Sequence, residues 1–401
     1  MKIVLFDFFI HYGGAPQLAA DTCRRLAMKD DVEVINVYGV CQQYVKVLKD
    51  IGIKLHVLDA ETRNVIVGYQ NNKLLRFLEL LRRIPAFLQI RNRLIRKIRE
   101  LAPDVIWTTT DKSLLFLMLS PLLNRYPVVK YDCGYREAGA IGKWQRFVNK
   151  KRATVIMTSS TETAKQLELA GIAPEHLKVV FETIDIAGVL EKSQSELEGP
   201  LPGQEISPRI LVPGTLLRTK GQHTEIKAVG RLKSQGFNST LWLAGDVIEK
   251  DNSYLEYLKD LAVETGVSEN VHFLGWRHDI YAVMNRCDIV LLPTYTEGFG
   301  RVTLEAMLLR KVAVTTPAGG MKDSIKDGYD GLFFPVNDDK SLAEQLARLI
   351  DDRRLSEKLI ENGYKTVAEK FYPEAHTKKV LAAFSNAMEL VRKQKSSKTL
   401  L

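Results

Sequence analysis

Residues Pro293-Thr-Tyr-Thr-Glu-Gly-Phe-Gly-Arg-Val-Thr-Leu-Glu-Ala306 follow the apolar run 288–292 and precede a short stretch with helical character. A buried strand, a glycine-containing turn and a helix start leave backbone N–H groups free to bind an anion. Glu297 lies where the strand ends, and Glu305 lies about one turn inside the helix. Both carboxylates are therefore predicted to face one ligand. The alternative is an ordinary strand–turn–helix with two solvated glutamates, which the Glu-Gly-Phe-Gly context disfavours.

This stretch belongs to the second of two series in which strands alternate with helices, a pattern typical of doubly wound α/β domains. Most of the strands are short continuous apolar runs, as expected for parallel sheets that are covered on both faces. In the first series the strands are expected at 2–8, 33–38, 54–58, 104–108, 128–132, 154–158 and 178–181. In the second they are expected at 209–212, 240–244, 271–274, 288–292, 312–315 and 332–334.

The polar segment 191–208 contains clustered Pro and Gly and no apolar period, so it is predicted to link two domains. The predicted domains are 1–190 and 209–373, and a last helix within 374–401 is expected to cross back to the first domain. The chain has no run of about 18 apolar residues and no secretory signal at its start. Its four cysteines form no Cys-x-x-Cys pair, which argues against a zinc site or a disulfide framework.

The two glutamates with seven residues between them resemble the E-x7-E motif of retaining nucleotide-sugar glycosyltransferases of the GT-B type, the large family four. The resemblance extends over most of the chain and implies two Rossmann-like doubly wound domains facing a cleft. It implies that Glu297 contacts the transferred sugar and that Glu305 contacts the ribose of the nucleotide. It also places the donor diphosphate at the turn and helix start, which contribute Gly298, Phe299, Gly300, Arg301, Val302 and Thr303.

A second motif, Gly214-Thr-Leu-Leu-Arg-Thr-Lys-Gly221, is similar to the family's Gly-Arg-x(3–5)-Lys-Gly loop, whose Arg and Lys bind the diphosphate. Lys220 matches by its Lys-Gly context. Thr215 stands where the arginine is usual, and Arg218 is the substitute candidate. Fixed cations here would neutralise the charge that develops on the leaving diphosphate.

Two further strand ends resemble donor-binding positions of the family. Gly245 ends the strand 240–244, beside the donor in relatives. Trp276 and Arg277 follow the strand 271–274, and either side chain could pack against the nucleobase.

The first domain contributes candidates for the acceptor side. His11, Gly13 and Gly14 follow the first strand, where the family has a Gly-Gly turn next to the donor phosphates and the acceptor. Tyr131 or Asp132 stands at the place of a histidine that lies by the transferred sugar in relatives, and Asp132 is the one expected to make the polar contact. Residues 181–185 stand where relatives often have Pro-Asn-Gly-Val-Asp; Asp185 matches, whereas the Asn-Gly does not.

The positive charge is concentrated in the first half of the chain. Residues 1–190 contain 28 Lys and Arg against 19 Asp and Glu, whereas 191–401 contain 29 of each. From Lys73 to Glu100, cations alternate with Leu, Ile and Phe at helical spacing, and Pro85 is expected to split this stretch into two helices. A basic amphipathic helix suits an anionic membrane surface, but it also suits a helix packed on a sheet with solvated cations. No motif indicates nucleic-acid binding.

The sequence thus predicts a hexosyltransferase that transfers a sugar from a nucleoside-diphosphate sugar to a glycan acceptor, lipid-linked or membrane-associated, in cell-surface polysaccharide biosynthesis. Its expected location is cytoplasmic, peripheral on the inner face of the cell membrane. No cofactor or metal is expected, since the chain has no Asp-x-Asp and no clustered His or Cys. The alternatives are an epimerase or phosphorylase of the same fold, and a non-catalytic membrane-docking scaffold.

Overall fold

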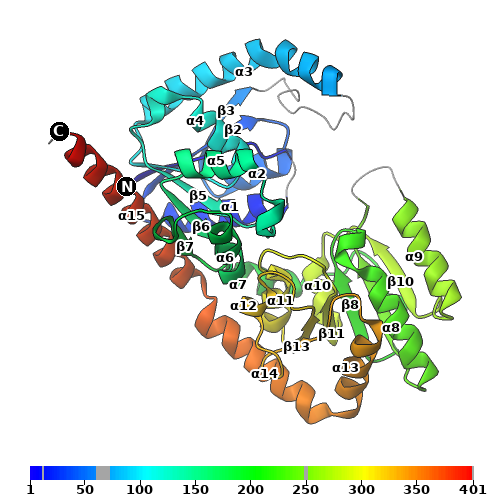
Figure 1. Ribbon diagram of the computed structural model, residues 1–401. Helices are drawn as coiled ribbons and strands as arrows, with labels where there is room; N and C mark the ends of the chain where they lie inside the picture. Colours follow the sequence, from blue (N-terminus) through cyan, green and yellow to red (C-terminus); the bar gives the residue numbers. More distant parts are fainter. Residues whose placement is uncertain (11–12, 60–72, 248–251, 400–401) are drawn as a thin grey trace. The chain divides into compact units, whose positions relative to one another are not determined.

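A computed structural model describes residues 1–10, 13–59, 73–247 and 252–399. The chain forms two compact units (Figure 1). The first unit consists of residues 1–159, 164–180 and 377–401, and the second of residues 160–163 and 181–376.

The first unit contains a seven-stranded parallel sheet with the strand order β3-β2-β1-β4-β5-β6-β7. Its strands are β1 (Lys2–Asp7), β2 (Asp31–Tyr38), β3 (Lys54–Asp59), β4 (Val105–Thr108), β5 (Val128–Asp132), β6 (Val155–Thr158) and β7 (Leu177–Val179). The helices in this part of the chain are α1 (Gly14–Leu26), α2 (Gln42–Asp50), α3 (Lys73–Leu101), α4 (Asp111–Met118), η1 (Pro121–Leu123), η2 (Ala138–Ala140), α5 (Lys143–Arg152), α6 (Thr161–Leu169), η3 (Pro174–His176) and, at the C-terminus, α15 (Pro373–Thr399).

The second unit contains a six-stranded parallel sheet with the strand order β10-β9-β8-β11-β12-β13. Its strands are β8 (Arg209–Pro213), β9 (Thr240–Ala244), β10 (Val271–Gly275), β11 (Ile289–Leu292), β12 (Val312–Thr315) and β13 (Leu332–Phe333). Its helices are α7 (Ile186–Ser193), η4 (Arg218–Lys220), α8 (Gln222–Ser234), α9 (Ser253–Glu264), α10 (Ile280–Arg286), α11 (Arg301–Leu308), α12 (Met321–Ser324), α13 (Asp339–Asp351) and α14 (Arg353–Lys370).

Each predicted strand is confirmed to within about two residues, and both sheets are doubly wound. Side chains along β8 alternate between two apolar cores, which shows that helices cover both faces of this sheet. Ile210 and Val212 enter one core, and Leu211 enters the other. Helices α8, α9 and α13 close the first of these cores. Helices α10, α11 and α14 contribute to the second. A strand that is buried on both faces has no side that points to solvent, which explains the nearly continuous apolar runs.

The C-terminal helix packs in the first unit, as predicted. Val380 and Phe384 of α15 are fully buried in the core that contains Trp107 of β4, and the Phe384 and Trp107 rings lie 6.1 Å apart. Arg25 of α1 also donates a hydrogen bond to the Thr377 hydroxyl at 3.2 Å.

The prediction that Pro85 splits the basic stretch was wrong, because α3 is one helix of 29 residues with Pro85 inside it. Pro85 is exposed, so the backbone carbonyl that loses its intrahelical hydrogen bond can be hydrated. Ile90, Leu94 and Ile98 of α3 are buried against the sheet of the first unit.

The segment predicted as a linker differs from the expectation, because it packs as part of the second unit. Its first three residues end α7, and Leu201 is buried in the core of that unit. The indole N–H of Trp242 donates a hydrogen bond to the Pro202 carbonyl at 2.8 Å. The boundary between the compact units therefore precedes Phe181 rather than lying at 191–208.

Among the helices of the described residues, none is long and apolar enough to cross a membrane.

One buried carboxyl in α8 yields a stability prediction. Glu225 is fully buried, and neither of its carboxyl oxygens has a hydrogen-bond partner in the described part of the chain. Burial raises the pKa of Glu225 well above its ordinary value of 4.5. Above pH 4.5 the unfolded chain releases this proton while the folded chain retains it, so the contribution of Glu225 lowers stability as the pH rises.

We expect Glu225→Leu to increase the free energy of unfolding by at least about 1 kcal/mol at pH 8 and by less at pH 4. Urea unfolding of the purified protein at both pH values measures this difference. The matched control is Glu264→Leu on the exposed face of α9, which should show no such dependence on pH. Equal gains at the two pH values would mean that Glu225 is not held neutral.

Candidate functional site

Most of the predicted donor residues lie at the carboxyl edge of the second sheet. In the strand order of this sheet, the chain proceeds outward from β8 to β9 and β10 on one side and from β11 to β13 on the other. The neighbours β8 and β11 therefore form the topological switch point, where the loops that follow the two strands diverge and leave room for a ligand. The loop after β8 carries Lys220, and the loop after β11 carries Glu297.

An ion pair joins these two loops. The Lys220 ammonium donates to Glu297 Oε2 at 2.7 Å, and the Gly298 backbone N–H lies 3.1 Å from Glu297 Oε1. The Tyr295 N–H also donates to the Thr219 carbonyl at 2.8 Å, so the loops are bonded through their backbones as well. The Lys220 and Glu297 side chains are 35% and 22% exposed, which leaves both accessible to a ligand.

Glycine is required where the loops meet and where α11 begins. Gly221 has φ +77°, and a Cβ at this position would lie 2.2 Å from the Pro293 carbonyl oxygen. Gly300 has φ +81° and precedes the first residue of α11, Arg301. A Cβ at Gly300 would clash with the Met321 sulfur at 2.3 Å. The left-handed conformation of Gly300 directs the chain from the turn into the helix, so the amides of the first turn of α11 lie at the same edge as Glu297.

The remaining residues of the predicted turn are mostly buried. Phe299 is 1% exposed and stacks on Phe181 with ring centroids 5.7 Å apart. Glu305 lies one turn inside α11, as predicted, and accepts a hydrogen bond from the Tyr281 hydroxyl of α10 at 3.1 Å. Thr303 is buried, and its hydroxyl donates to the Gly300 carbonyl at 2.6 Å. Phe299 and Thr303 thus anchor the turn, and their side chains do not project from it.

The structure separates the two candidate diphosphate cations. The Arg218 guanidinium lies over the rings of Tyr254 and Tyr257 of α9, at 5.3 and 4.9 Å from their centroids. Lys220, two residues later, pairs with Glu297 instead. Arg218 therefore contacts α9 through cation–π interactions, and Lys220 is the cation that the fold brings to the carboxylate of the turn.

The candidates at neighbouring strand ends also have different environments. Arg277 forms two hydrogen bonds with Asp279, at 2.7 and 2.6 Å, and its side chain is 11% exposed. Trp276 is 63% exposed, and its ring lies edge-to-face with that of His278 at 6.3 Å, so it is the more accessible side chain of this pair. Gly245 lies against the loop after β8, because a Cβ there would lie 1.9 Å from the Gly214 carbonyl oxygen.

In the first unit, His11 lies outside the described residues. A Cβ at Gly13 or Gly14 would meet no atom within 4 Å, so packing requires neither glycine. Asp132 belongs to a buried ionic network, in which its carboxylate accepts from the Lys130 ammonium at 2.9 Å and from Arg136 at 3.2 Å.

Lys130 is the centre of this network and is 1% exposed. It also pairs with Asp111 and donates to Asn149 at 3.2 Å. Burial alone would lower the pKa of Lys130, but the carboxylates of Asp132 and Asp111 outweigh it and raise the pKa. Asp132 therefore compensates a buried charge, a role that its position at the end of β5 did not predict.

Two buried carboxyls near strand ends were not predicted as site residues. Asp7, at the end of β1, accepts from the Thr109 amide and the Ser113 hydroxyl, both at 2.8 Å. Burial nevertheless raises its pKa. Glu182 of the second unit is 7% exposed, and burial raises its pKa to about 7. Arg301 opposes this rise, whereas Glu297 and Glu305 add to it. The sequence signal for Glu182 was its departure from the family's Asn.

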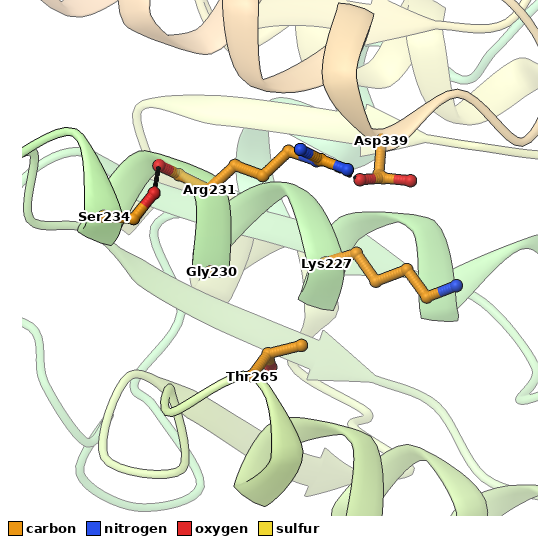
Figure 2. A pocket seen from close by; sticks show the side chains of 6 residues that line it. All are labelled: Lys227, Gly230, Arg231, Ser234, Thr265 and Asp339. Atoms are coloured by element: carbon orange, nitrogen blue, oxygen red, sulfur yellow. Dashed lines mark hydrogen bonds and ion pairs between the residues drawn. The ribbon is translucent and has the colours of Figure 1, made fainter.

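A separate pocket of about 430 Å³ lies along α8 (Figure 2) and is lined by none of the residues of the turn. Arg231 of α8 crosses it to pair with Asp339, and the Ser234 hydroxyl donates to the Arg231 carbonyl at 2.7 Å. These polar groups satisfy one another. Within the described ranges, no group of three or more His, Cys, Asp or Glu side chains is arranged to hold a metal ion.

A comparison with known proteins finds a family model that matches part of the chain. Residues 194–366 match the model of the family Glycosyl transferases group 1. The matched segment is less than half of the chain, but it contains both the Lys220 loop and the turn from Glu297 to Glu305.

The curated relatives match over parts of their length. The lipopolysaccharide core biosynthesis glycosyltransferase LpsE of Rhizobium meliloti is 29% identical over 50% of this chain and 55% of its own. The capsular polysaccharide biosynthesis glycosyltransferase CapM of Staphylococcus aureus is 32% identical over 39% of this chain and 40% of its own. An N,N'-diacetylbacillosaminyl-diphospho-undecaprenol alpha-1,3-N-acetylgalactosaminyltransferase of Campylobacter jejuni is 38% identical over 23% of this chain and 24% of its own. The chain thus spans about half the length of these relatives or less.

A solved structure matches over nearly the whole chain. Anabaena HepE in complex with UDP aligns with a TM-score of 0.78 and 22% identity, covering 96% of this chain and 100% of its own. At this identity the likeness shows the fold, which is GT-B.

The ionic network around Asp132 makes its role testable. We expect Asp132→Ala to lower the free energy of unfolding by about 3 kcal/mol, because the buried Lys130 would lose the more buried of its two carboxylate partners. Denaturant unfolding followed by circular dichroism measures the change. Asp50→Ala, an exposed position at the end of α2, is the control and should change stability by less than about 0.5 kcal/mol. If Asp132→Ala is as stable as this control, the network does not stabilise the fold.

Proposed function

We propose that the protein is a retaining glycosyltransferase that transfers a sugar from a nucleoside-diphosphate sugar to a glycan acceptor. The observation that carries the proposal is the Lys220–Glu297 pair, which joins the two loops of the switch point beside the N-terminus of α11. The match of residues 194–366 to Glycosyl transferases group 1 supports the same assignment.

On the donor side, the diphosphate would bind between Lys220 and the first-turn amides of α11. These groups are positive and held in place before the ligand arrives, so they stabilise the negative charge that develops as the sugar–phosphate bond breaks. Arg301, the first residue of α11, would add a further positive charge. The proposal includes no metal ion or cofactor, since these groups supply the charge that the leaving diphosphate requires.

Glu297 would accept hydrogen bonds from the transferred sugar, and Glu305 would accept them from the ribose. A carboxylate has two oxygens and can accept from both hydroxyls of a diol. Trp276 would pack against the base with its exposed ring. In a retaining reaction the acceptor hydroxyl approaches from the face on which the diphosphate leaves. The departing phosphate oxygen then takes the proton of that hydroxyl, so no protein base is needed.

The acceptor is proposed to be lipid-linked or membrane-associated, in the biosynthesis of a cell-surface polysaccharide at the cytosolic side of the membrane. Two named relatives act in lipopolysaccharide core and capsular polysaccharide biosynthesis, and a third carries an undecaprenol-linked acceptor in its name. The UDP bound to HepE makes uridine nucleotides the first donors to test.

The donor site predicts the effect of two substitutions. We expect Lys220→Met and Glu297→Gln each to lower kcat/KM for sugar transfer by about 100-fold or more, because each removes a group that contacts the reacting part of the donor. The assay follows release of the nucleoside diphosphate from a panel of uridine, guanosine and adenosine diphosphate sugars. NMR of the product determines whether the anomeric configuration is retained.

Lys259→Met is the matched control. Lys259 is a half-exposed lysine of α9, and among the described residues it forms an ion pair with Glu256, one turn earlier in the same helix. It should transfer sugar at the rate of the unmodified protein. Undiminished transfer by the Lys220 and Glu297 variants would overturn the site, and inversion at the anomeric carbon would overturn the retaining reaction.

We further propose that the first unit docks on an anionic membrane surface through α3. Opposite the packed face of Ile90 and Leu94, Ile84 and Leu88 are 45% and 39% exposed beside exposed arginines. On α5 the rings of Trp144 and Phe147 are also exposed, and they stack with centroids 5.4 Å apart. Exposed apolar side chains among cations suit the membrane interface, where each Lys or Arg contributes about 1 kcal/mol.

Sedimentation with lipid vesicles tests this docking. The protein should bind vesicles that contain phosphatidylglycerol, bind pure phosphatidylcholine vesicles at least about tenfold more weakly, and dissociate as salt is raised. The double variant Ile84→Ser/Leu88→Ser should lose most of the binding. Val263→Ser, at an exposed apolar position of α9 in the second unit, is the control. Binding that is the same for both lipids, or absent from both, would contradict the proposal.

A further inference from the structure

His223, the second residue of α8, is hydrogen-bonded to three other segments of the second unit. Its Nδ1 lies 3.0 Å from the Tyr254 hydroxyl of α9. Its Nε2 lies 2.9 Å from the hydroxyl of Tyr295, in the loop after β11, and 3.2 Å from Asn337 Oδ1, in the segment between β13 and α13. The imidazole therefore connects α8 to α9, to the segment before α13 and to the loop that carries Glu297.

The partners of the imidazole determine which of its nitrogens carries the hydrogen. Asn337 Oδ1 is a carbonyl oxygen and can only accept, so Nε2–H is the donor. Nδ1 is then the acceptor, and the Tyr254 hydroxyl donates to it. The Tyr295 hydroxyl accepts from the same Nε2–H as Asn337. In this neutral tautomer both nitrogens are hydrogen-bonded, which fixes the orientation of the ring.

The surroundings of His223 favour this neutral form. Burial lowers the pKa of His223 below its ordinary value of 6.5, and the cations Lys227 and Arg218 lower it further, whereas the hydrogen bond with Asn337 opposes the change. Burial also raises the pKa of Tyr254, so its hydroxyl keeps the hydrogen that Nδ1 accepts. The arrangement of hydrogen bonds around the ring is thus the one expected at neutral pH.

Tyr295 connects the imidazole to the turn that carries Glu297. The Tyr295 backbone N–H donates to the Thr219 carbonyl at 2.8 Å, and Thr219 directly precedes Lys220. The Tyr295 side chain is held by His223. Glu297 follows two residues later, and its carboxylate pairs with Lys220 at 2.7 Å. Tyr295 is therefore fixed through its backbone and its side chain where the chain enters the turn.

The second half of the turn is held by other contacts. Phe299 is 1% exposed, and the Glu297 carbonyl accepts from the Gly320 backbone N–H at 3.0 Å. Loss of the contact between His223 and Tyr295 should therefore leave the turn folded and loosen only its first half. Such a change reduces the precision with which the Glu297 carboxylate is placed, and the rate of a reaction is sensitive to that precision.

We propose that His223 is a positioning residue for sugar transfer: it holds the Tyr295 hydroxyl and so fixes the first half of the turn, with Glu297 placed to face the transferred sugar. The inference rests on the proposed function, because it concerns the same site. His223 acts through Tyr295 and not through a contact with the donor. Its loss should therefore lower kcat, which depends on the placement of the reacting sugar, and leave the affinity for a nucleoside diphosphate, which lacks the sugar, unchanged.

Two single variants test this role in the full-length protein. His223→Ala removes the imidazole, and Tyr295→Phe removes only the hydroxyl that the imidazole holds. We expect each to lower kcat about tenfold, which is the equivalent of one hydrogen bond. The dissociation constants of UDP, GDP and ADP should stay within about twofold of those of the unmodified protein. Release of the nucleoside diphosphate from the nucleotide sugar measures kcat, and isothermal titration measures the dissociation constants.

Two further variants separate positioning from a general loss of structure. His223→Gln has a side-chain amide that can donate in place of Nε2–H, so it should restore kcat to within about threefold of the unmodified protein. The double variant His223→Ala/Tyr295→Phe should lose no more than either single variant, because both changes remove the same contact. Losses that multiply in the double variant would overturn the inference, as would affinity for the nucleoside diphosphate that falls as much as kcat.

Tyr329→Phe is the matched control for the loss of a tyrosine hydroxyl. Tyr329 lies between α12 and β13 of the second unit and is 39% exposed, against 37% for Tyr295. This variant should keep the kcat of the unmodified protein. If His223→Ala does not fold, Tyr295→Phe carries the test, since it keeps the ring and removes one partly exposed hydroxyl.

The two proposals fail in different ways. If the unmodified protein neither binds nor uses any uridine, guanosine or adenosine diphosphate sugar, the proposed function is wrong and the inference falls with it. If transfer depends on Glu297 but the His223 and Tyr295 variants keep the unmodified kcat, the donor site stands and only the role of His223 is overturned.

Discussion

The parallel pairing of β8 with β11 is the constraint on which the proposed donor site depends. These strands are neighbours in space although six other elements lie between them in sequence, namely η4, α8, β9, α9, β10 and α10. Their pairing brings the two following loops to one edge of the sheet, where Lys220 meets Glu297. Gly221 has to be glycine for the same reason, because the Pro293 carbonyl of the other loop occupies the space of a side chain. The ion pair is thus a consequence of strand order, and a shift of either strand by one residue would turn its side chains to the opposite face.

Lys130, Glu225 and Glu182 are three buried titratable side chains with different surroundings, and these differences indicate their roles. Lys130 is surrounded by carboxylates that keep it charged, so its network stabilises the first unit at a fixed ionisation. The carboxyl oxygens of Glu225 have no hydrogen-bond partner among the described residues. Glu225 lies in a closed core, where burial of the neutral acid lowers the stability of the fold. Glu182 is also buried, and burial raises its pKa to about 7, a rise that Arg301 opposes and that Glu297 and Glu305 add to. A group whose ionisation is poised by a functional site, rather than fixed by a partner, is the kind that can respond to a ligand.

Much of the fold could be predicted because it depends on local patterns. Continuous apolar runs predicted the strands. Glu297 and Lys220, with their neighbouring glycines, predicted the two loops at the switch point. The position of Glu305 followed from the helical period. The environment of Asp132 could not be predicted, since it depends on Asp111 and Asn149, which are distant in sequence. The single helix through Pro85 was missed because solvent exposure of the backbone decides whether a proline is tolerated there.

The position of Arg218 affects how much positive charge the proposed donor site contains. Its guanidinium is held by two tyrosine faces of α9, and leaving them would forfeit both cation–π contacts. Lys220 instead pairs with Glu297 of the turn. Thr215 stands where the similar Gly-Arg-x(3–5)-Lys-Gly loop has its arginine. Among the described residues of the proposed site, Lys220, Arg301 and the first-turn amides of α11 then supply the positive charge. A site with so few cations tolerates few carboxylates, and Glu297 and Glu305 already occupy it. That balance gives a physical reason why the negative neighbours Glu297 and Glu305 add to the raised pKa of Glu182.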